Sequence, residues 1–143
     1  MKPQIVDRER IVLAGFSFFG DPFAESGGWT DANEIGRLWH RLFTYLAAHR
    51  GSLPQAEDDS LAYEVHVECD ETASKGCREV SVGIEVGTLR EIPVELLVKV
   101  LPPSQYVVFT LQGEQIASDW SRKICDWMAT NGYTAAHRYG FQL

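Results

Sequence analysis

The chain has 143 residues, and its 13 Lys and Arg against 20 Asp and Glu give a formal net charge of -7. This length fits one domain of ordinary size. An apolar fraction of 45% and an aromatic fraction of 11% can build a core, which excludes a wholly disordered chain. The acidic balance argues against nucleic acid as the main partner, because neutralising phosphates requires clustered Lys and Arg. It suits a cationic ligand, and it is also an ordinary means of solubility.

Targeting signals and metal motifs are missing from the sequence. The apolar runs are too short to span a membrane, and the first residues lack the apolar stretch of a secretory signal. Cys69, Cys77 and Cys125 form no metal-ligand spacing with each other or with the histidines. We therefore expect a cytoplasmic protein with reduced thiols, no metal and no cofactor.

The first half begins with a short strand over residues 3–9 and a buried strand over 11–20. A helix follows, capped by Thr30 or Asp31, with Glu34 at capping-box spacing from Asp31. The helix carries one apolar stripe at the 3.6-residue period, made of Ile35, Leu38, Trp39, Leu42, Phe43 and Leu46. Strict alternation over 61–69 and 79–87 then predicts an antiparallel hairpin with one apolar and one polar face.

The second half contains further strands and one helix. Strands are predicted over 95–101 and 105–111, separated by Pro102 and Pro103, which cannot take part in a β-ladder. A helix is predicted from about residue 114 to 130, and a final strand over 133–138. The apolar stripe of this second predicted helix consists of Ile116, Trp120, Ile124, Trp127 and Met128.

The two halves, about residues 1–90 and 91–143, follow the same plan of strand, helix and strand. The pair Ile35 and Trp39 in the first helix has the same spacing as Ile116 and Trp120 in the second. Chance is the alternative, since any two amphipathic helices can share this spacing. A duplication predicts an antiparallel sheet with two helices packed on one face, a pseudo-two-fold axis, and a cleft at the seam.

An ordered set of motifs in this sequence resembles the GyrI-like small-molecule-binding family, which includes the effector-binding domains of AraC-type and MerR-type multidrug-responsive regulators. The motifs are Ile35-x3-Trp39-x3-Phe43, Val82-Gly83-Ile84-Glu85-Val86, Leu101 to Phe109 with Gly113, Trp120 to Tyr133, and Phe141-Gln142-Leu143. The resemblance covers nearly the whole chain. It implies a single domain over residues 1–143 with an α+β fold of duplicated β-α-β-β units.

The resemblance also implies a function. Such domains bind hydrophobic, frequently cationic compounds in a central cleft lined by aromatic side chains, with a carboxylate opposite the positive charge. Gln142 stands where the family has a closing Glu, so any charge recognition must come from elsewhere. The domain leaves no segment for a DNA-binding helix-turn-helix, so we expect a stand-alone binding module. A second copy of the chain and a separate regulator remain open as protein partners, and no membrane is expected as a partner.

Glu85 is the leading candidate for the carboxylate, because it lies mid-strand beside Gly83, which leaves room against the sheet. The alternative is an exposed Glu on the solvent face, and Glu68 and Glu64 are the runners-up. Aromatic side chains supply faces for a lipophilic cation, or else pack in the core. The candidates for lining the cleft are Trp39, Trp120, Tyr63, Tyr106 and Phe141.

Two functions are compatible with these residues. The first is a non-catalytic module that binds hydrophobic, cationic small molecules. The second, implied by the resemblance, is a hydrolase of small electrophilic compounds that uses Glu85 or Glu68 as a general base.

Overall fold

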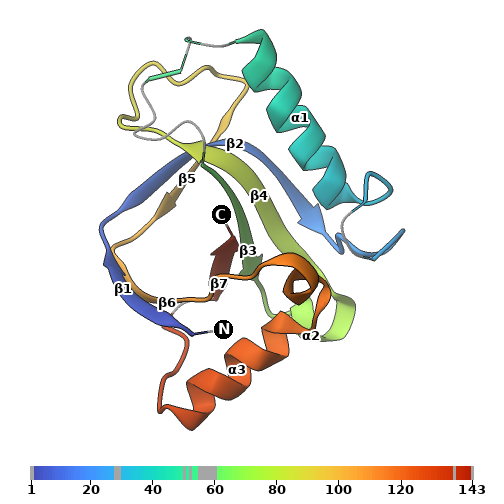
Figure 1. Cartoon of the computed structure of the whole chain (residues 1–143). Helices are drawn as coiled ribbons and strands as arrows, with labels where there is room; N and C mark the ends of the chain where they lie inside the picture. Colours follow the sequence, from blue (N-terminus) through green and yellow to red (C-terminus); the bar gives the residue numbers. More distant parts are fainter. Residues whose placement is uncertain are drawn as a thin grey trace. The chain divides into compact units, whose positions relative to one another are not determined.

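The computed structural model describes residues 2–27, 30–49, 51, 53–54, 61–136 and 138–142, with Phe141 and Gln142 described by their backbone alone. The chain divides into two compact units (Figure 1). The first unit comprises residues 1–10 and 102–137, and the second comprises residues 11–101 and 138–143. The fold is α+β with antiparallel sheets, as the sequence predicts.

The elements follow one another along the described chain as β1 (Gln4–Arg8), β2 (Ile11–Gly20), α1 (Glu34–Ala48), β3 (Ala62–Glu68), α2 (Thr72–Lys75), β4 (Arg78–Glu85), β5 (Leu97–Leu101), β6 (Ser104–Val108), the 3-10 helix η1 (Gly113–Ala117), α3 (Trp120–Thr130) and β7 (Tyr139–Gln142).

The second unit is built on a five-stranded antiparallel sheet in the order β5-β2-β4-β3-β7. Helix α1 packs on one face of this sheet (Figure 1). Ile35, Leu38 and Leu42 from the predicted stripe are buried there against Val80 and Val82 of β4. The helix begins two residues later than a cap at Asp31 would give, because the N-cap is Asn33, whose side chain accepts a hydrogen bond from the Gly36 N–H at 3.1 Å.

The strands form two antiparallel sheets and not the predicted single one. Strands β1 and β6 form a separate two-stranded sheet in the first unit, which also contains α3. The pairing of β1 with β6 nevertheless keeps the register in which β2 pairs with β5. The ladder is interrupted at Pro102 and Pro103, which have no N–H to donate, so the predicted effect of the two prolines is confirmed.

The β3–β4 hairpin does not have the one apolar and one polar face that its alternation predicts. The register places Tyr63 opposite Gly83 and Glu64 opposite Val82, so the apolar face of β3 adjoins the polar face of β4. Glu64 consequently lies on the face that α1 covers. Alternation within each strand was read correctly, but the relative register of two strands depends on what covers each face.

The second predicted helix is also divided. Residues 113–117 form the 3-10 helix η1, and α3 begins only at Trp120 because the Asp119 side chain caps it, accepting from the Arg122 N–H at 3.2 Å. Ile116 and Trp120 are therefore not on one helix, and this part of the repeat pattern is lost. The duplication itself stays a prediction.

The last strand lies later in the chain than predicted, at Tyr139–Gln142 instead of 133–138. It pairs with β3 and forms an edge of the five-stranded sheet. Among the described residues, no helix is long and apolar enough to cross a membrane.

Candidate functional site

The candidate site lies on the face of the five-stranded sheet that is turned away from α1, which we call the helix-free face. Strand alternation assigns side chains to it, and the buried cluster of Ile11, Leu13, Tyr63, Val65 and Leu101 marks its apolar part. The other side chains used below that the alternation places on this face are Glu79, Ser81, Glu85 and Lys99.

Two glycines face each other in the middle of the helix-free face. Gly15 of β2 pairs with Gly83 of β4, and Gly83 also pairs with Tyr63 of β3. A Cβ atom at Gly15 would lie 1.8 Å from the Val82 carbonyl oxygen, and one at Gly83 would lie 2.6 Å from the Ala14 carbonyl oxygen. The backbones approach too closely for any side chain, and both glycines are buried; we call this part of the sheet beside Tyr63, which carries backbone alone, the bare floor.

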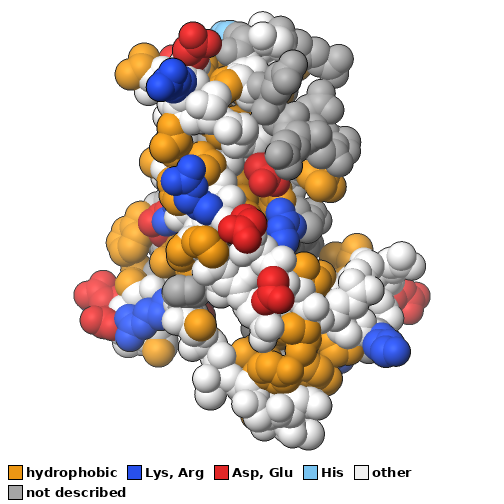
Figure 2. Space-filling model, turned by 90° about the vertical axis from the view of Figure 1, so that its left-hand side faces the viewer, with side chains coloured by type: hydrophobic (Ala, Val, Ile, Leu, Met, Phe, Trp, Pro, Cys, Tyr) orange, Lys and Arg blue, Asp and Glu red, His pale blue; other side chains and the backbone are white. Residues whose placement is uncertain are grey.

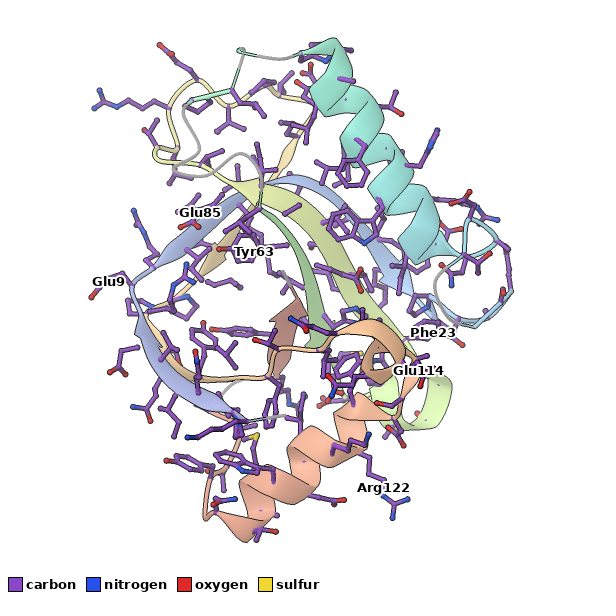
Figure 3. All side chains as sticks on the ribbon, in the orientation of Figure 1. Glu9, Phe23, Tyr63, Glu85, Glu114 and Arg122 are labelled. Carbon is purple, nitrogen blue, oxygen red and sulfur yellow. The ribbon has the colours of Figure 1, made fainter. Side chains whose placement is uncertain are left out.

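Tyr63 and Glu85 form a hydrogen-bonded pair beside this floor. The Tyr63 hydroxyl donates to Glu85 Oε2 at 2.9 Å, from a ring that is only 1% exposed. Figure 3 shows the two side chains lying together on the side of the sheet away from α1. The predicted Glu85 and Tyr63 are thus brought together, and Glu85 is half-buried instead of projecting fully into solvent. The bond fixes the carboxylate against the sheet.

An ion pair spans another part of the helix-free face. Lys99 Nζ lies 2.7 Å from Glu79 Oε1, although Lys99 is paired with Leu13 and Glu79 with Phe19, six positions further along β2. Six residues of a flat strand extend about 20 Å, which is too far for the two side chains to span. The sheet must therefore twist and curve toward this side, which makes the helix-free face concave.

Trp39 belongs to α1, which packs on the opposite face of the sheet. Its indole Nε1–H donates to Glu64 Oε2 at 2.6 Å, and His66 Nε2 lies 2.6 Å from Glu64 Oε1. Glu64 is only 1% exposed, and the Trp39 ring stacks on Phe43 with centroids 5.5 Å apart. The structure therefore does not bring Trp39 together with the Tyr63–Glu85 pair. The sequence pattern gave no reason to expect this buried carboxylate under the helix.

Glu68 lies at the far end of the hairpin. It is exposed and lines a hollow of about 320 Å³ with Cys69, Asp70, Thr72, Ala73 and Arg138. The Arg138 guanidinium bonds the Asp70 carboxylate at 2.6 Å and lowers the pKa of that carboxyl. None of these described lining residues is aromatic, so they offer no ring face to a lipophilic cation.

Three predicted lining residues remain, namely Tyr106, Trp120 and Phe141. Tyr106 of β6 and Trp120 of α3 belong to the first unit, where both are half-buried. The side chain of Phe141 lies outside the described residues, and its backbone pairs with Val65 on β3. Sequence reasoning missed Glu79 and Lys99, although the lone Lys in Leu97-Val98-Lys99-Val100-Leu101 was a signal that this apolar strand carries one charge on the helix-free face.

The chain also matches a family model. The model is described as Cass2, integron-associated effector binding protein, and it matches residues 4–142. The chain belongs to this family. The GyrI-like resemblance is thereby confirmed, and the function class is that of a small-molecule-binding, effector-binding domain.

Solved structures share the fold of this Cass2 family member at low sequence identity. SAV2435 bound to tetraphenylphosphonium has 15% identity and a TM-score of 0.68, covering 99% of this chain and 81% of that one. The integron cassette protein VCH_CASS2 from the mobile metagenome of Vibrio cholerae has 16% identity and a TM-score of 0.59, covering 97% and 85%.

A third similar structure is a bacterial transcription regulation protein from Staphylococcus aureus MU50. It has 17% identity and a TM-score of 0.61, covering 99% of this chain and 84% of that one. A search of curated protein sequences finds no match.

The described residues contain no group of three or more His, Cys, Asp or Glu side chains placed to hold a metal ion. The three cysteines are free thiols. On the face shown in Figure 2, acidic and basic side chains are interspersed, so this face has no patch of one sign.

Proposed function

We propose that the chain binds hydrophobic cationic small molecules on the helix-free face, with Glu85 as the carboxylate that receives the positive charge. The observation that carries this proposal is the Tyr63–Glu85 hydrogen bond of 2.9 Å beside the bare floor of Gly15 and Gly83. The phenol holds the carboxylate in one orientation, and its ring is itself buried. A cation is favoured by a nearby carboxylate whose orientation is already fixed.

Two further observations support the proposal. Membership of an effector-binding family makes a small molecule the expected ligand class. SAV2435, which shares the fold, has been solved with tetraphenylphosphonium, a lipophilic cation. The curvature of the helix-free face gives such a compound more contact area than a flat sheet would.

Titration with tetraphenylphosphonium, followed by calorimetry and by the melting temperature, tests the proposal. We expect binding to raise the melting temperature through ligand linkage. Glu85→Gln should weaken this binding about tenfold, or about 1.4 kcal/mol, while leaving the binding of uncharged triphenylphosphine oxide nearly unchanged. Glu68→Gln, on the exposed end of the same hairpin, is the matched control and should bind both compounds as the wild type does.

The proposal fails if no lipophilic cation binds, or if the two Glu variants lose affinity equally. Loss of the charged and the neutral ligand to the same extent in Glu85→Gln would show that this residue supports the fold of the site and does not recognise charge.

The Tyr63–Glu85 pair also favours a second candidate function, hydrolysis of a small electrophile. In this reaction the Glu85 carboxylate would take a proton from water, and the oxygen of that water would bond to the electrophilic carbon as its leaving group departs. Mass spectrometry of the ligand recovered after incubation distinguishes the two functions. Ligand recovered unchanged from a panel of electrophiles supports binding alone, and a product that has gained water supports the enzyme.

A further inference from the structure

One carboxylate of the helix-free face already forms an ion pair with a lysine side chain. Lys99 reaches from the edge strand β5 to Glu79 on β4, with Nζ 2.7 Å from Oε1. The two side chains are 24% and 34% exposed, so the pair is partly withdrawn from water. The Ser81 hydroxyl donates to the same Glu79 oxygen at 3.1 Å, from a residue that is itself buried.

This pair lies on the same face as the proposed ligand site. Glu79 and Glu85 are six residues apart on β4 and project from the same side of it, as strand alternation requires. A bound cation near Glu85 would therefore share the face with the Lys99 ammonium. The lysine neutralises Glu79 and adds a fixed positive charge to this surface.

We infer that Lys99 acts as an internal cation that keeps Glu79 from serving as a second cation subsite, and so makes the site selective for singly charged over doubly charged ligands. This inference rests on the proposed function. The ligands that it excludes are elongated dications whose second charge would have to compete with the Lys99 ammonium for Glu79. Such competition is unfavourable, because the lysine is tethered in place while the ligand charge is not.

Lys99→Met tests the inference, because Met retains an apolar side chain of similar length and removes the charge. The probes are a bis-quinolinium with a decamethylene spacer and the mono-quinolinium that carries the same ring. In the wild type we expect the dication to bind no more tightly than the monocation. In Lys99→Met the ratio of dication to monocation affinity should rise about tenfold, since a second carboxylate becomes available.

The double variant Lys99→Met/Glu79→Gln is the matched control, and its affinity ratio should return to that of the wild type. The single variant Glu79→Gln tests the inference in a second way, because it should weaken ligand binding. It leaves the Lys99 ammonium without its carboxylate, so the affinity for the monocation should fall about tenfold through repulsion between like charges. Melting temperatures show whether each variant is folded, and the single Glu79→Gln variant keeps the test available if Lys99→Met does not fold.

The outcomes separate this inference from the proposed function. A wild type that binds the monocation, with an affinity ratio that Lys99→Met leaves unchanged, overturns the role of Lys99 and leaves the proposed function standing. The role of Lys99 is also overturned if the ratio of dication to monocation affinity rises as much in the double variant as in Lys99→Met, because Glu79 would then not be the second cation subsite. If neither the wild type nor Lys99→Met binds either cation, the proposed function fails and the inference fails with it.

Discussion

The contact between Trp39 and Glu64 allows a direct test of what Trp39 does. The sequence suggests a residue that lines a ligand cleft, whereas the indole N–H is bonded to a carboxylate that is 1% exposed under α1. We expect Trp39→Phe to destabilise the protein and to leave the affinity for tetraphenylphosphonium nearly unchanged. Phe keeps an aromatic ring beside Phe43, so the main loss is the hydrogen bond.

The size of the effect follows from the burial of the acceptor. A hydrogen bond to a charged group contributes about 1.5–3 kcal/mol, and water cannot easily replace the donor at an acceptor this deeply buried. We therefore expect Trp39→Phe to lower the free energy of unfolding by about 2–3 kcal/mol. For a chain of this length that corresponds to a fall of about 7–10 °C in melting temperature.

Chemical denaturation of a double-mutant cycle with Glu64→Gln measures the pairwise part of this energy. If the hydrogen bond from the Trp39 indole to the Glu64 carboxylate stabilises the fold, Trp39→Phe should lower the free energy of unfolding less in the Glu64→Gln background than in the wild type. The reasoning is refuted if Trp39→Phe shifts the melting temperature by less than about 2 °C while weakening ligand binding more than about tenfold. That result would return Trp39 to the ligand site.

Two further predictions concern the floor of the helix-free face and the end of the hairpin. Gly15→Ala should cost more than about 3 kcal/mol of unfolding free energy, and more than Gly83→Ala, because its methyl group would meet backbone at 1.8 Å instead of 2.6 Å; comparable denaturation midpoints for the two variants would contradict this. Arg138 holds the pKa of Asp70 below its usual value, so this ion pair stabilises the fold above about pH 4 and its contribution is lost as pH falls through the folded-state pKa. Asp70→Asn should therefore weaken protection of the β7 amides from hydrogen exchange near neutral pH and have no such effect at pH values where Asp70 is protonated. Equal loss of protection at both pH values would show that charge is not the cause.

Local patterns in the sequence were enough to place most of the second unit. The bounds of β2 and the buried stripe of α1 follow from apolar periodicity, and the prolines at 102 and 103 mark the interruption between β5 and β6. These features depend on one element at a time. The break before Trp120 was missed because the helical period of Ile116 and Trp120 hides the cap at Asp119, which begins a new helix.

The site was harder to predict than the fold, because it depends on register. Alternation shows that Glu64, Glu79 and Glu85 each lie on one face of a strand, but it does not show which faces of β3 and β4 adjoin. The Gly83 pairing with Tyr63 decides this, and it is a property of the assembled sheet. Register also explains why Glu79 and Lys99 were not expected to meet, since on a flat sheet they would be about 20 Å apart.

Three carboxylates of the hairpin therefore have different chemical roles although the sequence presents them alike. Glu64 accepts from Trp39 and contacts His66 in a buried position, which commits it to the packing of α1. Glu79 is held by a tethered ammonium, and a ligand could use it only by displacing Lys99. Glu85 accepts a hydrogen bond from the Tyr63 phenol, which orients the carboxylate. The contacts of Glu64 and Glu79, and not their place in the alternation, count against these two carboxylates, and for this reason we propose Glu85 as the cation-binding residue.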